Sequence, residues 1–285
     1  MTIEAYAKVN LTLEVFGKRT DGYHALRSLV APITLSDTLE IEPTDDGSLT
    51  CDTGFADDLC IRAASVLMSS VSRLPSHSGA RIRVMKRIPV GGGLGGGSAD
   101  AAATLRALNE LWELGKSPDE LAEIGSAVGS DVPALVLAQH HRAPVLMEGR
   151  GERVSRGTGD VPDGRLVLAN PGIVVSTAEI YRLCVPRTVP ATDAVNDLQE
   201  AAVRRHPEIG RTLSHLKAAG ATNVMMSGSG ATCFGFAPDA PSVQKIAEQV
   251  ARSGNVCWVV GFVRTRTANS RFCARNGRKA HQFCS

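Results

Sequence analysis

The strongest constraint on the fold of this chain is a run of six glycines in seven positions, residues 91–97, interrupted at Leu94. Apolar and polar residues alternate over 80–88, which is typical of a strand, and Pro89 lacks the backbone N–H that would continue the strand. After the glycines, Ser98 can cap a helix. Glycines between a strand and a helix leave backbone N–H groups free to point at one anion, beside the positive end of the helix. The sequence therefore predicts a phosphate-binding loop.

Other interpretations of this loop are weaker. The glycines also match the dinucleotide motif GxGxxG at Gly91, Gly93 and Gly96, but no acidic residue follows at the end of a second strand, as a dinucleotide site requires. A Walker loop is excluded because the Gly-Lys-Ser/Thr ending is missing. A flexible linker is the remaining alternative, and it is disfavoured because a strand and a helix adjoin the loop directly.

The first part of the chain is expected to form a sheet. Residues 3–15 are apolar at every odd position, which is the period of a half-buried strand. Lys8 and Asn10 therefore share the face that points away from the core. Two further strand-like runs, near 26–33 and 38–43, predict an antiparallel meander.

Three helices are expected before residue 130. Asp57 or Asp58 caps a helix over 57–72, Ser98 caps a second, and a capping box at Ser117 begins a third that stops at Gly129.

The order of elements after residue 164 predicts a second domain. Strands are expected at 165–170, 222–226, 231–236 and 256–263, and helices at about 176–183, 194–205, 207–219 and 241–253. With neighbouring helices merged, this order is βαββαβ, the ferredoxin-like plan. The fold class is therefore α+β, with domains over 1–155 and 156–263.

Composition narrows the class of protein. No run approaches the roughly 20 apolar residues of a membrane-spanning helix, and the N-terminus lacks the pattern of a signal peptide, so we expect no membrane contact. The seven cysteines are scattered without CxxC spacing, which disfavours a disulfide framework or a zinc site and favours the cytoplasm.

The net charge of +2 comes from the C-terminal end of the chain. Residues 264–285 hold six of the 31 basic residues and no acidic residue, so residues 1–263 carry 25 basic against 29 acidic residues, a net charge of −4. We expect a disordered basic tail over 264–285.

Four segments carry a resemblance to a known family. PVGGGLGGGSADAA at 89–102 resembles the ATP-binding motif of the GHMP kinases, which phosphorylate small alcohols. AYAKVNLTLEVFGKRTDGYHAL at 5–26, GSDVPALV at 129–136 and MMSGSGATCFGF at 225–236 narrow the resemblance to the member that phosphorylates the C2 hydroxyl of a cytidine diphosphate ester of methylerythritol, in the non-mevalonate route to isoprenoids.

The resemblance runs from about residue 3 to residue 263, in motif order, and does not include the tail. It implies an N-terminal ATP-binding domain, with a ribosomal-protein-like βαβ unit and antiparallel strands, and a ferredoxin-like substrate domain.

The resemblance also implies roles for individual residues. Asp131 would take the proton of the alcohol, and Lys8 would favour the ionised carboxylate and offset charge on the transferring phosphoryl group. The alternatives for Asp131 are a surface ion pair or a helix cap. The residues expected around ATP are Pro89, Val90, Gly91, Gly92, Gly93, Leu94, Gly95, Gly96, Gly97, Ser98 and Ala99.

The substrate residues implied by the resemblance centre on the cytosine base. Tyr23 would stack on the base, His24 would bond its edge, and Tyr181 would close the other side, unless Tyr181 is simply helix core. Asn10 is expected to contact the substrate because it shares the face of Lys8. Gly228 and Gly230 are expected beside the active site, with an ordinary hairpin turn as the alternative.

The expected cofactors are ATP and Mg²⁺, with Ser98 as a candidate metal ligand. The expected partner is the small-molecule substrate, without nucleic acid, and the chain is expected to be a monomer or a weak homodimer. Two other functions stay open: a different GHMP kinase, of homoserine or mevalonate type, and a nucleic-acid-binding protein that uses the basic tail.

Overall fold

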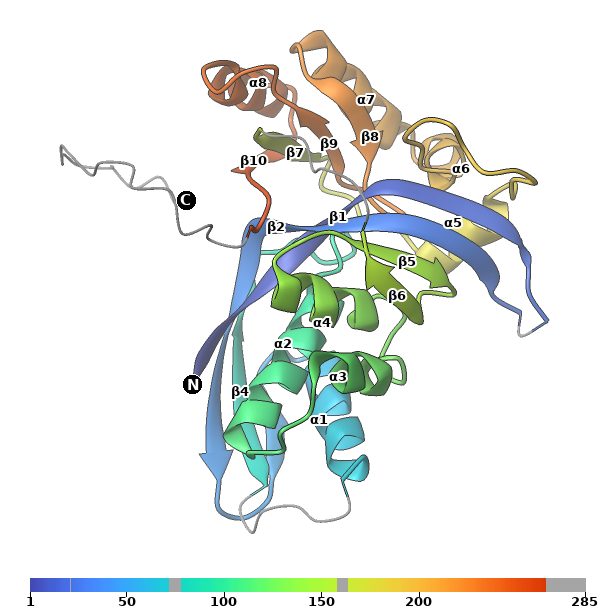
Figure 1. Ribbon diagram of the computed structural model, residues 1–285. Helices are drawn as coiled ribbons and strands as arrows, with labels where there is room; N and C mark the ends of the chain where they lie inside the picture. The colour runs from blue at the N-terminus through green and yellow to red at the C-terminus, as the bar shows by residue number, and fades with distance from the viewer. Residues whose placement is uncertain (21, 72–77, 158–163, 265–285) are drawn as a thin grey trace, which may run out of the picture.

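The computed structural model describes residues 1–20, 22–71, 78–157 and 164–264. It contains two sheets, and helices pack on one face of each (Figure 1). The strands are β1 (Thr2–Lys18), β2 (His24–Thr44), β3 (Leu49–Cys51), β4 (Gly79–Met85), β5 (Val145–Gly149), β6 (Arg153–Arg156), β7 (Leu166–Asn170), β8 (Thr222–Met226), β9 (Cys233–Phe236) and β10 (Val256–Val260). The helices are α1 (Leu59–Ser69), α2 (Gly96–Leu111), α3 (Pro118–Gly125), α4 (Val132–His141), α5 (Thr177–Leu183), α6 (Leu198–Arg205), α7 (Pro207–Ala218) and α8 (Ser242–Ala251).

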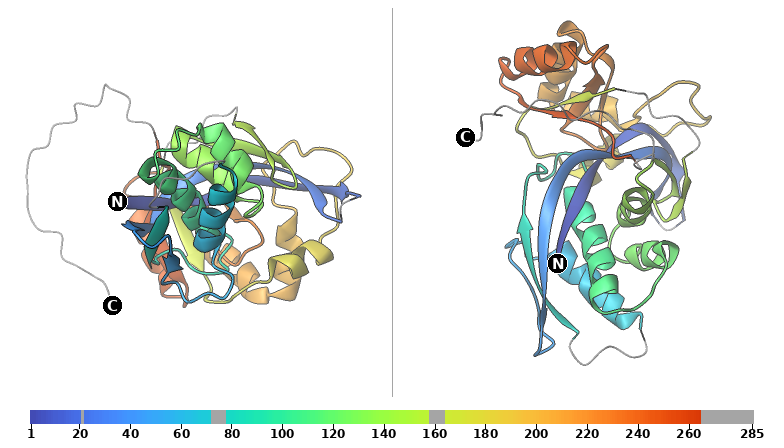
Figure 2. Two further views of the ribbon diagram at one scale, coloured as in Figure 1. Left: turned by 90° about the horizontal axis from the view of Figure 1, so that it is seen from below. Right: turned by 60° about the vertical axis from the view of Figure 1, so that its left-hand side comes forward.

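The first sheet has the order β3-β4-β2-β5-β6, and β1 pairs with β2. Strands β3 and β4 are parallel and are joined through α1, so they form a βαβ unit in an otherwise antiparallel sheet. Helix α2 packs on β1 and β2 and is flanked by α1 and α4, as the right-hand view of Figure 2 shows. The expected α+β class is confirmed.

Strand β2 corrects the prediction of two separate strands over 26–33 and 38–43. It is continuous, but it changes partner midway, pairing Leu26–Val30 with β5 and Thr38–Thr44 with β4. Between these halves its backbone groups are satisfied from far along the chain, because Thr34 N–H donates to Gly261 O and Val263 N–H donates to the Pro32 carbonyl. Sequence periodicity cannot reveal such distant partners.

The loop-to-helix junction differs from the expected Ser98 cap. Helix α2 begins at Gly96, and its N-cap is Gly95, with φ of +70° and no side-chain cap bond. Glycine adopts this left-handed conformation without a steric cost, so the chain enters the helix earlier than expected. The other caps agree with the sequence: Asp58 caps α1, and Ser117 forms a capping box at α3.

Several elements were not expected. Strands β3, β5 and β6 have only three, five and four residues, too few for alternation in the sequence to reveal them. Helix α4 is almost entirely buried, so its sequence lacks the polar face by which a surface helix is recognised.

The second sheet is antiparallel, with the order β10-β7-β9-β8. Helix α7 packs on β7, β8 and β9, and α8 packs on β7 and β10. This arrangement confirms the ferredoxin-like plan. The division into domains at residue 155 stays a prediction, and the expected tail falls outside the described residues apart from Arg264.

Among the described residues, no helix combines the length and the apolar character that crossing a membrane requires.

Candidate active site

A cavity of about 1070 Å³ brings together segments from both sheets. Its wall includes β1, the glycine loop, the first residues of α1 and α2, the approach to α4, helix α5 and the loop after β8. The expected site residues on the wall are Lys8, Asn10, Tyr23, His24, Pro89, Val90, Gly91, Gly92, Gly93, Gly95, Gly96, Gly97, Ser98, Asp131, Tyr181 and Gly228. Residues as far apart in the chain as Lys8 and Gly228 therefore line the same cavity.

The glycine loop is held against the loop that follows β8. Thr232 N–H donates to Gly92 O at 3.1 Å, and the Ser227 hydroxyl donates to Gly93 O at 3.0 Å. Gly93 has φ of +74°, and a Cβ there would lie 2.2 Å from the Ser227 carbonyl oxygen. Only glycine fits this close approach of two backbones.

Lys8 lies on the cavity wall, and only 4% of its side chain is exposed. Its backbone N–H donates to Leu94 O at 3.0 Å, and its Nζ donates to Gly93 O at 2.9 Å and to Asn10 Oδ1 at 2.6 Å. The expectation that Lys8 and Asn10 share a face is confirmed. A buried ammonium group placed this way is available to an anion held by the loop.

Asp131 precedes α4 and faces Lys8, with Oδ2 3.6 Å from Nζ. Asp131 occupies the N-cap position of α4, as the alternative interpretation expected, but its side chain makes no cap bond to the helix. The pair is not a surface ion pair, because Lys8 is buried while 35% of the carboxylate is open toward the cavity. The geometry leaves this carboxylate free to accept a proton from a bound molecule.

Three rings lie at another part of the wall. His24 and Tyr181 are stacked, with centroids 5.9 Å apart and planes 29° apart. Tyr23 is 54% exposed, and the Arg150 guanidinium lies 5.7 Å from its ring centre. Tyr181 also packs against the core, and this burial, followed by the charge of Asp131, raises the pKa of its hydroxyl. Tyr181 therefore both packs against the core and lines the cavity.

Near the glycine loop, Lys86 bridges two buried carboxylates. Its Nζ lies 2.6 Å from both Asp37 Oδ2 and Asp100 Oδ2. Burial raises the pKa of Asp100 to about 7, against the opposing effect of Lys86. Asp100 Oδ1 is buried and has no hydrogen-bond partner among the residues that the structure describes. Sequence reasoning did not find this cluster, because its members come from β2, from α2 and from the residue after β4.

Asn196 was also not expected. Its Nδ2 donates to Met226 O at 2.7 Å and to Gly228 O at 2.8 Å, so it fixes the loop that touches Lys8. The neighbouring Asp197 forms a bidentate pair with Arg187 and accepts from Val15 N–H, which ties this segment to β1. A lone Asn in a polar segment carries no sequence signal for such a role.

Three expected residues lie behind the wall. The Leu94 and Ala99 side chains are fully buried in the core. Gly230 packs against Met226 and Ile209, because a Cβ there would lie 2.9 Å from Met226 Sδ and 3.3 Å from Ile209 Cδ1.

Two family models match this chain. The GHMP kinases N terminal domain matches residues 58–139, and the GHMP kinases C terminal domain matches residues 190–256. The first match contains the glycine loop and Asp131, and the second contains Asn196 and Gly228.

Curated relatives match over nearly the whole chain. The 4-diphosphocytidyl-2-C-methyl-D-erythritol kinase of Pelotomaculum thermopropionicum is 39% identical over 297 residues, which cover 95% of this chain and 99% of the relative. The protein of the same name from Ruegeria pomeroyi is 39% identical over 279 residues, covering 90% and 97%.

Solved structures agree with these relatives. A crystal structure of 4-(cytidine 5'-diphospho)-2C-methyl-D-erythritol kinase is 32% identical, with a TM-score of 0.79, and covers 93% of this chain and 100% of its own. A homoserine kinase from Cytophaga hutchinsonii, at 15% identity, a TM-score of 0.73 and coverage of 93% and 95%, shares the fold. The chain therefore belongs to the GHMP kinase family and, within it, to the 4-diphosphocytidyl-2-C-methyl-D-erythritol kinases.

Proposed function

We propose that this kinase transfers the γ-phosphoryl group of ATP to the C2 hydroxyl of 4-diphosphocytidyl-2-C-methyl-D-erythritol, giving the 2-phosphate and ADP. The observation that carries the proposal is the buried Lys8 beside Asp131, at 3.6 Å, next to the glycine loop and in the same cavity as the three rings. A phosphate-binding loop, a cation and a proton acceptor are the parts that phosphoryl transfer to an alcohol requires.

The phosphate groups of ATP are assigned to the glycine loop and the N-terminus of α2. Backbone N–H groups there supply donors without a side chain, and the helix end favours negative charge. The adenine is assigned to the apolar wall near Phe55, Leu59 and Ile88, on the side of the loop that faces α1.

Proton transfer is assigned to Asp131. Its carboxylate accepts the proton of the C2 hydroxyl as the oxygen attacks the γ-phosphorus, and the ADP oxygen leaves in line. The Lys8 ammonium group offsets the charge on the transferring group. Asn10 accepts from Lys8 Nζ and donates to Ser28 Oγ at 2.8 Å, so it orients the ammonium group and adds a polar contact for the substrate.

The cytosine is assigned to Tyr23, His24 and Tyr181. Aromatic faces stack on a base, and an imidazole can bond its polar edge. Gly228 lies at the other end of the substrate, beside Lys8. A Cβ at this position would lie 3.1 Å from Lys8 Nζ, so glycine leaves room there.

Mg²⁺ is proposed as the ion that accompanies ATP and offsets charge on its phosphates. It needs few protein ligands, and the Ser98 hydroxyl on the cavity wall is a suitable one. We also propose a cytoplasmic location and a monomer or weak homodimer, as expected from the sequence.

The proposed substrate is tested by measuring ADP release from ATP with two alcohols. We expect turnover with the cytidine diphosphate ester and little turnover with free methylerythritol, because the free alcohol lacks the base that the three rings would bind. Equal turnover of the two would contradict the assignment, and turnover of homoserine or mevalonate alone would indicate another GHMP activity.

A further inference from the structure

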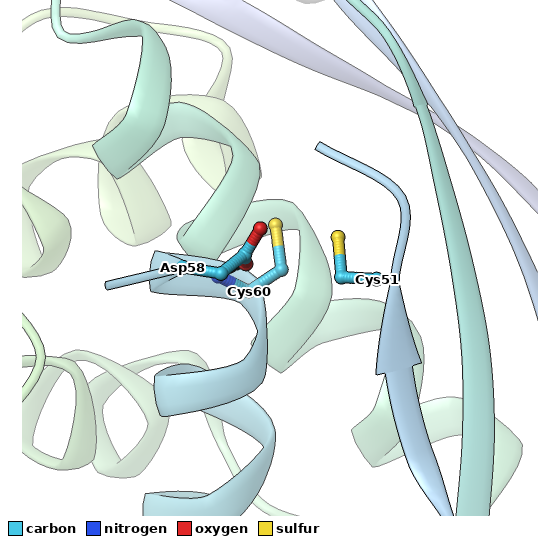
Figure 3. Close-up of side chains that lie close together, drawn as sticks. All are labelled: Cys51, Asp58 and Cys60. Carbon is cyan, nitrogen blue, oxygen red and sulfur yellow. Dashed lines mark hydrogen bonds between the residues drawn. The ribbon is translucent and has the colours of Figure 1, made fainter. Parts of the chain in front are cut away.

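Two cysteines and an aspartate converge at the start of α1. Cys51 is the last residue of β3, Asp58 is the N-cap of α1, and Cys60 lies in the first turn of that helix. Their two sulfur atoms and a carboxylate oxygen all lie within 4.8 Å of one another. Figure 3 shows the three side chains extending in the same direction from the strand and the helix.

We propose that Cys51, Asp58 and Cys60 form a binding site for a thiophilic divalent cation of the Zn²⁺ class. In tetrahedral zinc sites, two ligands of one ion are separated by about 3.3 to 3.8 Å. Small side-chain rotations would bring the three ligand atoms to that separation. A solvent molecule would complete the fourth position.

The Asp58 carboxylate has one acceptor site for this ion beyond its bonds to the helix backbone and to Thr53. Its Oδ1 accepts from Cys60 N–H at 2.7 Å and from Ile61 N–H at 3.1 Å, and its Oδ2 accepts from the Thr53 hydroxyl. A carboxylate has about four acceptor sites, so these three bonds leave one, which the Cys51 thiol approaches and which an ion would take in place of the thiol proton. The cap also holds the carboxylate in place, which lowers the cost of organising the site.

The ligand types select the ion. Two sulfur ligands favour Zn²⁺ or Cd²⁺ over Mg²⁺ and Ca²⁺, which prefer oxygen. With both thiols ionised the three ligands carry three negative charges, so a divalent cation leaves one, and the positive N-terminus of α1 stabilises it.

The position of the site next to the large cavity distinguishes it from a buried core pair. Thr53, Asp58 and Cys60 all line the cavity, so an ion can reach the ligands from there. The separation of nine positions between the cysteines matches no common zinc motif, which is why the sequence disfavoured a metal site.

The test measures Cd²⁺ and Zn²⁺ binding to the full chain in a non-chelating reductant. The parent protein carries Cys273→Ser and Cys284→Ser, because those thiols lie outside the described residues. Binding of Cd²⁺ is followed by sulfur-to-metal charge-transfer absorbance, and of Zn²⁺ by competition with a chromogenic chelator. The variants added to the parent are Cys51→Ser, Cys60→Ser and Asp58→Asn.

We expect one ion per parent chain and an affinity at least about tenfold lower in each variant. Asparagine keeps the N-cap, so Asp58→Asn removes the charged ligand without removing the cap. Cys257→Ser is the matched control, since Cys257 is half-buried like Cys51, and it should bind as the parent does. Binding by Cys51→Ser or Cys60→Ser as tight as that of the parent would overturn the proposal, and so would unchanged binding by Asp58→Asn.

Discussion

The loop end and the ring end of the cavity are built in different ways. At the loop end, the glycine backbone, buried Lys8 and the Ser227 segment are joined by hydrogen bonds between elements far apart in the chain. At the ring end, Tyr23 is more than half exposed, and His24 meets Tyr181 mainly through ring contact.

This difference corresponds to two tasks. Transfer of a phosphoryl group depends on fixed donors and charges, which a buried, hydrogen-bonded backbone supplies without reorganisation. Recognition of a base depends on flat apolar surface, which exposed rings can supply while they adjust to the ligand. Changes at the loop end should therefore affect catalysis and stability, and changes at the ring end should affect substrate affinity.

The largest effect is expected for Asp131→Asn. The amide keeps the size of the carboxylate but cannot accept the proton, so kcat should fall by about 10³-fold. Steady-state ADP release measures kcat, and calorimetric titration with an ATP analogue measures nucleotide binding, which should stay near that of the unmodified protein. Retained turnover would remove Asp131 from the proton-transfer step.

Gly93→Ala tests the close contact between the two loops. The methyl group would collide with the Ser227 carbonyl, and the free energy of unfolding should fall by about 3 kcal/mol, with loss of turnover. Gly172→Ala is the matched control: φ is +77°, but no described residue lies within 4 Å of the added Cβ, so it should cost only about 1 kcal/mol. Equal losses in denaturant titrations would show that backbone conformation alone, and not the contact, requires glycine.

Asp100→Asn tests the buried charges beneath the loop. The folded pKa of Asp100, about 7, lies above its ordinary value of 3.8, so the folded state holds this proton more tightly than the unfolded chain. The stability that this provides is complete below about pH 4 and is lost as pH rises through 7. The unmodified protein should therefore lose a few kcal/mol more of its unfolding free energy than the variant between pH 4 and 8. Urea titrations at each pH give the unfolding free energy of both proteins. If it changed with pH by the same amount in both, the expectation would be contradicted.

His24→Ala should have the smallest effect and should act on affinity. Loss of one contact to the base should raise KM for the cytidine substrate by about tenfold, equivalent to about 1.4 kcal/mol, while kcat changes little. His140→Ala, at an exposed position in α4, is the control. An unchanged KM would remove His24 from base recognition, whereas a large loss of kcat would erase the distinction between the two ends.

Local patterns predicted much of the fold. Alternation predicted β1, and capping residues predicted the starts of α1 and α3, because these signals depend on neighbours in the chain. The patterns failed where distant segments supply the partners. Strand β2 is hydrogen-bonded between its two halves by residues near 261, and residues 132–139 of α4 are all buried.

The candidate site divides in the same way. A glycine loop between a strand and a helix, and the shared face of Lys8 and Asn10, follow from residue types and spacing, because both depend on local backbone geometry. Other contacts depend on how separate elements pack against one another. They are the 3.6 Å separation of Lys8 and Asp131, the Lys86 cluster, the hydrogen bond from Asn196 to Gly228, and the proximity of Cys51 to Cys60. Periodicity describes one element at a time, whereas these sites arise from long-range packing, which sets distances between residues that share no local pattern.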